Sequence, residues 1–252
     1  MEKSESYIVP AFDRGLKLIE LLGKTPDGST IPEMECLNIP PASLFRLLAT
    51  LVENGYAVRE KGNIYRLTGK MLKTVSQGFE NSALVPCSIT PMRELRDASQ
   101  ESAMLAILHG TEGVVIHQEP SPLPVKVMLA PGHHFPLHSA APAKAMMAFL
   151  PPQELEELVK SIDFVRFTDR TIGSADELKK ELLQIRESNC AFDMGEELPD
   201  LRCIASAIFD GSGRPCAAVW ISGPASRLHE ERMTILSYAV KKAAEDISAK
   251  IQ

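Results

Sequence analysis

The fold of the N-terminal part is decided by residues 39–56, IPPASLFRLLATLVENGY. Leucines at 44, 47, 48 and 51 have the i, i+3, i+4, i+7 spacing of one apolar helical face. The pair Asn54-Gly55 ends the predicted helix. Its opposite face carries small, polar and charged side chains: Ala42, Arg46, Ala49 and Glu53, flanked by Ser43 and Thr50.

The flanking residues predict two earlier helices and a hairpin. Apolar residues at 12, 16, 19 and 22 form the first helix, which Gly23 ends. A short helix is expected at 32–37, with Thr30 as its cap and Asn38 as a left-handed terminator. Strands are expected at 56–59 and 63–67, joined by a loop at 60–62. Three helices followed by a two-stranded wing describe a winged helix-turn-helix.

Charge along the chain favours DNA as the partner of this unit. The whole chain has a net charge of −6, whereas residues 43–73 carry six basic and two acidic side chains. A local basic segment on an acidic chain is typical of a DNA-reading module joined to another domain. A solvated charged face is the alternative for the basic segment, and a three-helix protein-interaction domain is the alternative for the whole unit. The expected contacts to double-stranded DNA are Pro41, Ala42, Ser43, Arg46 and Thr50 on the helix and Arg59, Lys61 and Arg66 on the wing.

Composition excludes several classes of protein. The chain has 252 residues, 44% of them hydrophobic and 24% charged, which is typical of a globular protein of one or two domains. No apolar run approaches the ~20 residues of a membrane span. The N-terminus does not resemble a secretory signal. Five cysteines without a CxxC pair indicate reduced thiols rather than disulfides or a zinc site. We therefore expect a cytoplasmic protein that does not associate with membranes.

Residues 83–252 alternate helical and strand patterns. Helices are expected at 86–99, 141–150, 152–160 and 175–188, and strands at 103–108, 114–118, 124–129, 190–193, 203–209 and 215–222. A long amphipathic helix closes the chain. Its predicted inward residues are Met233, Leu236, Val240, Ala243 and Ile247. The fold class is α+β, with an antiparallel sheet covered by helices.

Several separated motifs together resemble the IclR-type family of bacterial transcriptional regulators. The resemblance covers nearly the whole chain. The motifs are Asp13-Arg14-x-Leu16-x-Leu18-Ile19, the Ser43–Tyr56 segment, Pro136–Ala145, Arg166-Phe167-Thr168, Cys203-Ile204-Ala205 and Ile221-Ser222-Gly223-Pro224.

The resemblance implies a winged helix at 1–68, a linker helix at 69–82 and a GAF-like domain for effector binding and oligomerisation at 83–252. It also implies a homodimer or a dimer of dimers. Met71, Leu72, Val75 and Phe79 could form the dimer seam, or could pack within one subunit.

The same resemblance implies an effector pocket between the sheet and residues 139–143. Its expected lining is Ala141, Pro142, Asp193, Leu201, Cys203, Trp220 and Ser222. Backbone N–H groups at a helix start and the Ser222 hydroxyl suit a carboxylate. The chain departs from the family at Ala143, where glycine is usual, and at Trp220. Strand alternation places Trp220 on the face of Ser222, so the indole is expected in the pocket, with a core tryptophan as the equal alternative.

Enzyme and metal chemistry find less support. The chain lacks a Gly-x-Ser-x-Gly motif, a phosphate loop and a dinucleotide fingerprint. His133, His134 and His138 are interpreted as loop histidines rather than metal ligands, and Cys203 as a core thiol rather than a nucleophile. We expect a regulator, in particular a repressor, whose effector changes operator affinity and which needs no cofactor or metal. A hydrolase using Cys203 and a sensor that does not bind DNA are the alternatives.

Overall fold

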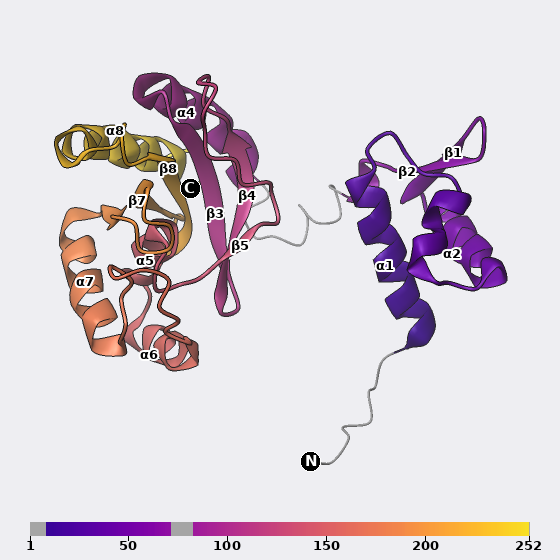
Figure 1. The fold of residues 1–252 in the computed structure, drawn as a ribbon, viewed down its shortest axis with the longest axis horizontal. Coiled ribbons are helices and arrows are strands. Elements are labelled where there is room, and N and C mark those ends of the chain that lie inside the picture. Colours follow the sequence, from indigo (N-terminus) through magenta and orange to yellow (C-terminus); the bar gives the residue numbers. More distant parts are fainter. Residues whose placement is uncertain (1–8, 72–82, 252) are drawn as a thin grey trace, which may run out of the picture. The chain divides into compact units, whose positions relative to one another are not determined.

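The computed structural model describes residues 9–71 and 83–251. The chain divides into two compact units, Met1–Ser82 and Ala83–Gln252, which are described separately (Figure 1). The expected linker helix at 69–82 lies outside the described residues from position 72 onward, and so does most of the predicted dimer seam.

The described part of the first unit is a winged helix-turn-helix, as predicted. Its elements in chain order are α1 (Pro10–Lys24), the 3-10 helix η1 (Pro32–Leu37), α2 (Pro41–Glu53), β1 (Ala57–Glu60) and β2 (Ile64–Leu67). The two strands pair antiparallel, with Ala57 opposite Leu67. A single core joins the helices to the wing: Leu18, Leu22, Met34, Ile39, Leu44, Leu48 and Tyr65 are all buried.

The second helix differs from the prediction in type and in its cap. It is a 3-10 helix, and Ile31 occupies the cap position without a side-chain bond. Thr30 instead donates to the Glu33 carboxylate through its backbone N–H, at 2.7 Å, and through its hydroxyl, at 2.9 Å. Asn38 ends the helix with a left-handed φ of 52°, as expected.

The second unit is an α+β domain built on one antiparallel sheet. In the described residues the strand order is β5-β4-β3-β8-β7-β6. The elements are α4 (Leu84–Ser99), β3 (Ser102–His109), β4 (Glu112–Glu119), β5 (His134–Phe135), α5 (Ala141–Met147), α6 (Pro152–Ser161), α7 (Ala175–Ser188), β6 (Ala191–Asp193), β7 (Leu201–Phe209), β8 (Pro215–Pro224) and α8 (Glu230–Ser248).

Helices cover both faces of this sheet (Figure 1). Met104, Ala205 and Trp220 belong to the core on the side of α5 and α7. Their neighbours Leu105, Ile204 and Val219 belong to the core under α4 and α8. Successive side chains of a strand point to opposite faces, so a strand covered on both sides becomes almost continuously apolar. The five inward residues predicted for the last helix are all buried.

One predicted strand is wrong. Residues 124–129 alternate in polarity but form no strand, and the short β5 pairs with the edge of β4 instead. Side chains bind the backbone of this segment: the Ser102 hydroxyl donates to Val127 O at 2.7 Å, and Leu129 N donates to Gln118 Oε1 at 2.6 Å. Because these bonds replace a strand ladder, alternation alone was misleading here. The predicted helix at 141–150 is also shorter, ending at Met147.

Within the described ranges, no helix combines the length and the apolar character needed to cross a membrane.

Candidate nucleic-acid interface and effector site

The outer face of α2 is available for contact with a partner. Pro41 opens the helix, while Leu44 and Leu48 are buried on the inner side. Ala42, Arg46 and Thr50 are exposed and Ser43 is half-buried. The Arg46 Nε–H donates to Ala42 O at 3.2 Å, and the Thr50 hydroxyl donates to Arg46 O at 2.7 Å. The remaining N–H groups of Arg46 have no partner among the described residues.

Phe45 belongs to the same outer face but was missed by the sequence reasoning. Its side chain is 53% exposed. Positions 42, 45, 46 and 49 follow i, i+3, i+4, i+7 spacing, so the signal was present beside the leucine face. An exposed phenylalanine beside an arginine can contact a thymine methyl group in the major groove.

Two of the three basic side chains of the wing already contact neighbouring side chains. Arg66 Nη2 lies 2.5 Å from the Glu60 carboxylate. Arg59 donates to Asn63 Oδ1 and its guanidinium lies 5.9 Å from the centroid of the Tyr65 ring. Lys61 is exposed in the turn and has no bonded partner within the residues described. Phosphate binding by Arg66 would therefore compete with Glu60, whereas Lys61 needs no such exchange.

Three of the residues predicted for the effector site lie side by side at the end of the sheet. Asp193 on β6 is opposite Cys203 on β7, and Cys203 is opposite Ser222 on β8. The Cys203 thiol donates to the Ser222 hydroxyl at 3.3 Å. All three are buried, and directly paired residues share a face. The prediction that Trp220 and Ser222 share a face with these residues agrees with the register.

The other predicted lining residues surround this trio. Ala141 and Pro142 begin α5, which packs on β7 and β8, and both are buried. Leu201 is half-buried against the same core. Ser139, just before α5, has a buried hydroxyl oxygen without a hydrogen-bond partner in the described residues. Buried polar atoms are normally satisfied, so this hydroxyl is a candidate ligand contact.

Trp220 lies in the core. The indole is 2% exposed and meets the Phe135 ring edge-to-face at 5.8 Å between centroids. Two surface cavities of this domain, of 780 and 460 Å³, are lined by other residues and include none of the seven predicted positions. This is the arrangement described by the core alternative, in which the indole fills space under the sheet.

A buried charged cluster lies beside Asp193 and was missed by sequence reasoning. Lys144 is completely buried in α5, and its Nζ lies 2.5 Å from Glu181 Oε1 and from Glu196 Oε1. Burial alone would lower the pKa of Lys144, but the two carboxylates outweigh it and raise this pKa. These partners are 37 and 52 residues away in sequence, so local patterns carry no trace of the contact.

Burial acts in the opposite direction on the neighbouring acids. It raises the pKa of Glu196 to about 8, against the pull of Lys144. It also raises the pKa of Asp193, although the backbone N–H groups of Gly195 and Glu196 donate to Asp193 Oδ1 at 2.8 and 2.7 Å. The Asp193 carboxyl therefore holds a proton more readily than an exposed aspartate does.

Nucleophilic and metal chemistry gain no support from these positions. Burial raises the pKa of the Cys203 thiol well above its usual value, which disfavours the reactive thiolate. His134 binds Glu112 at 2.7 Å, and His138 Nε2 donates to Val165 O at 2.9 Å. Across the described positions, no group of three or more His, Cys, Asp and Glu side chains is placed to hold a metal ion.

Comparisons with known proteins match both units. Residues 80–249 match the family model for the C-terminal part of the bacterial transcriptional regulator IclR, and residues 11–61 match that of the IclR helix-turn-helix domain. The HTH-type transcriptional regulator BhcR of Paracoccus denitrificans is 30% identical over 242 residues, covering 95% of this chain and 86% of BhcR. The HTH-type transcriptional repressor AllR of Escherichia coli K12 is 31% identical over 240 residues, covering 94% and 89%. The crystal structure of Thermotoga maritima IclR matches with a TM-score of 0.78 and 27% identity, covering 95% of this chain and 98% of that one.

Replacing Trp220 tests its place in the core. We expect Trp220→Ala to lower the free energy of unfolding of the C-terminal unit by about 3–5 kcal/mol, because it leaves a cavity against Phe135. Chemical denaturation measures the loss. Leu183→Ala, at a position that is 66% exposed, is the control and should change stability by less than about 0.5 kcal/mol. Equal, small effects of both substitutions would contradict the core position of the indole.

The charged cluster predicts a pH dependence of stability. Between pH 4.5 and about 8 the folded protein holds a proton on Glu196 that the unfolded chain releases, so stability falls as pH rises through this window. Glu196→Gln removes that proton release. The free energy of unfolding of this variant should therefore fall less between pH 4.5 and about 8 than that of the wild type. Denaturation at several pH values measures both slopes. Glu157→Gln, at an exposed position on α6, should keep the wild-type slope. A Glu196→Gln slope as steep as the wild type would exclude this titration.

Proposed function

The chain belongs to the IclR family of bacterial transcriptional regulators, and we propose that it controls transcription in response to a small-molecule effector bound in residues 83–252. Members of this family are DNA-binding regulators rather than enzymes. The AllR relatives are named repressors, which supports repression as the outcome here. The proposal rests on two features that occur in one chain. Arg46 is exposed on α2 of a winged helix-turn-helix, and Asp193, Cys203 and Ser222 are buried polar side chains at one end of the sheet in the other unit.

The DNA contacts that we propose follow from exposure on α2 and the wing. The start of α2, at Pro41, Ala42 and Ser43, is small enough for close approach to base edges in the major groove. Arg46 then reaches a guanine or a phosphate, and Thr50 and Phe45 extend the contact along the groove. The three wing residues Arg59, Lys61 and Arg66 bind the sugar-phosphate backbone.

The effector site that we propose lies at Asp193, Cys203 and Ser222, closed by Ser139 and the start of α5. The support is chemical: a carboxyl with a raised pKa, a thiol, a hydroxyl and an unpartnered hydroxyl all occur there on buried side chains. Such a set suits a small oxygen-rich molecule, with a carboxylate as the first class to test.

The effector site and the DNA interface would be coupled through the arrangement of the subunits. We propose a cytoplasmic homodimer, or a dimer of dimers, in which effector binding favours one arrangement of the two recognition helices. The effector changes operator affinity only by the ratio of its affinities for the two arrangements. The repeat of half-sites in the operator would then match the two-fold symmetry of the protein.

Alanine substitutions on α2 and the wing test the DNA interface. On an operator first located by footprinting upstream of the gene, Arg46→Ala should weaken binding by ~1–3 kcal/mol and relax preference at one base position. Lys61→Ala should weaken binding to all sequences alike and lower the slope of log affinity against log salt by ~1. Gel shift or fluorescence anisotropy across a salt series measures both.

A matched control distinguishes contact from folding. Arg214→Ala removes an exposed arginine of the C-terminal unit that pairs with Glu154, and should leave operator affinity unchanged. If Arg46→Ala binds the operator normally while remaining folded, the proposed groove face is wrong. An unchanged salt slope for Lys61→Ala would remove the wing from the DNA.

A screen of small carboxylates tests the effector site. A true effector should raise the melting temperature and change operator affinity in the same concentration range. In the Ser222→Ala variant, about tenfold more effector should be needed to change the melting temperature and the operator affinity. The substitution removes a hydrogen bond worth about 1.4 kcal/mol. Ser88→Ala, on α4, is the control for a lost buried hydroxyl, because Ser88 is fully buried and donates to Leu84 O at 2.6 Å. A ligand whose effect survives Ser222→Ala unchanged does not bind in this site.

A further inference from the structure

Arg202 is a buried cation without an acidic partner among the described residues. The residue is 9% exposed. Its Nη1 donates to two backbone carbonyls, Pro199 O at 2.9 Å and Leu201 O at 2.6 Å. These bonds fix the guanidinium, and no carboxylate of the described residues lies within ion-pair distance of it. The buried Asp193 is farther away, although the charge of Arg202 still acts to lower the pKa of that carboxyl. Buried charges in proteins are normally paired, so this arrangement points to a missing anion.

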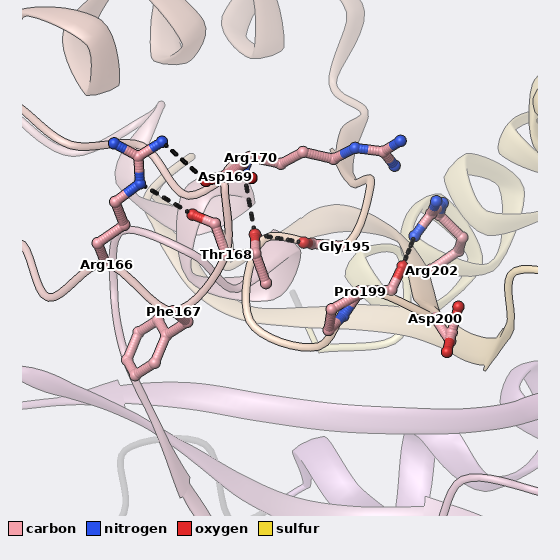
Figure 2. A pocket seen from close by; sticks show the side chains of 9 residues that line it. All are labelled: Arg166, Phe167, Thr168, Asp169, Arg170, Gly195, Pro199, Asp200 and Arg202. Atoms are coloured by element: carbon pink, nitrogen blue, oxygen red, sulfur yellow. Dashed lines mark hydrogen bonds and ion pairs between the residues drawn. The ribbon is translucent and has the colours of Figure 1, made fainter.

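Arg202 lines an open cavity of 780 Å³, together with residues 166–170 and with Gly195, Pro199 and Asp200 (Figure 2). Arg170 lines it too, and its Nη1 donates to Met194 O at 2.7 Å without an ion pair in the described chain. Arg170 and Arg202 also line the neighbouring cavity of 460 Å³, so the two guanidinium groups lie between both spaces. Arg166, at the other end of the segment in Figure 2, is already paired with Asp169 at 3.3 Å.

Side-chain hydrogen bonds hold the two walls of the cavity together. The Thr168 hydroxyl donates to Gly195 O at 2.7 Å and accepts from Arg170 N at 3.1 Å. Gly195 has a φ of +94°, and a Cβ built there would lie 2.7 Å from Arg202 Nη1. Glycine at this position therefore lets the backbone approach the guanidinium closely. The cavity wall is preorganised, which lowers the cost of binding a ligand.

Acidic side chains near the cavity do not neutralise these arginines. Asp169 and Asp200 line the larger cavity, and Glu230 and Glu231 line the smaller one. All four are exposed, and none forms an ion pair with Arg170 or Arg202. Their charges are therefore strongly screened by solvent, which weakens their attraction for the two arginines.

We propose that Arg202 and Arg170 bind an oxyanion, the carboxylate or phosphate group of a small metabolite, in this cavity. Planar guanidinium groups bind such groups through paired, charge-assisted hydrogen bonds. The site is separate from the proposed effector site, because Arg202 and Cys203 are consecutive on β7 and point to opposite faces of the sheet. It does not depend on the proposed function, because binding can be measured without DNA.

Titration of the full-length protein with simple anions tests the site. Inorganic phosphate and malonate are the two probes, each compared with chloride at equal ionic strength and pH, by calorimetry and by thermal shift. We expect saturable binding of at least one probe, and the stronger probe identifies the phosphate or the carboxylate class. Arg170→Gln should weaken it by about tenfold or more, because one charged donor is lost.

Two further variants make the result decisive. Arg202→Gln should abolish binding of the probes. Because the Arg202 side chain also supports the loop, this variant could lose binding through misfolding. Arg170 is exposed, so Arg170→Gln tests binding without that complication. Arg214→Gln, at an exposed arginine paired with Glu154, should bind the probes like the wild type. The proposal is overturned if chloride produces the same thermal shift, if the response to both probes does not saturate, or if Arg170→Gln and Arg214→Gln behave alike.

Discussion

Strands β3, β8 and β7 are covered by helices on both faces, and most of the C-terminal unit follows from that constraint. A strand buried on both sides carries mostly apolar side chains, because a buried polar group there cannot bond to water. Ser206, in the middle of β7, departs from this rule: its buried hydroxyl has no hydrogen-bond partner in the described residues. Most polar side chains of this region accordingly lie near the strand ends, where Asp193, Cys203 and Ser222 are neighbours, and in the loop that follows β6. Lys144 is the exception within a helix, and it is tolerated because Glu181 and Glu196 both reach its ammonium group.

The loop between β6 and β7 contributes residues to both proposed sites. On its inner side, Asp193 accepts two backbone hydrogen bonds from the turn that it begins. The Thr168 hydroxyl donates to Gly195 O in the same turn, and further along the loop Pro199 O accepts a hydrogen bond from the Arg202 guanidinium. The proposed effector site and the proposed oxyanion site therefore share one short, well-supported segment. A change in either site can reach the other through the position of this loop, without a longer route through the core.

Local periodicity predicted the helices well and the strands less well. Ala175–Ser188 was predicted with its observed bounds, and the structure shows why they are sharp: Ser174 caps the helix and Asn189 ends it with a left-handed φ of 46°. Residues 124–129 were misread because alternation does not require a paired ladder. The sequence predicted the exposed face of α2 that we propose to contact DNA, apart from Phe45. The partners of Lys144, the carbonyl bonds of Arg202 and the core position of Trp220 depend on contacts between distant segments, which single-sequence patterns do not contain.

The pairing of Arg66 with Glu60 on the wing affects how a regulator of this kind would search a chromosome. A wing that carries its own carboxylate has a weaker hold on arbitrary phosphate backbone than one with an unpaired arginine. A genome offers on the order of a million or more competing sites, and every gain in indiscriminate affinity is multiplied by that number. If the wing contacts the DNA backbone as we propose, Glu60 would lower the fraction of protein held on the wrong DNA, and fewer copies per cell would be enough to occupy the intended site.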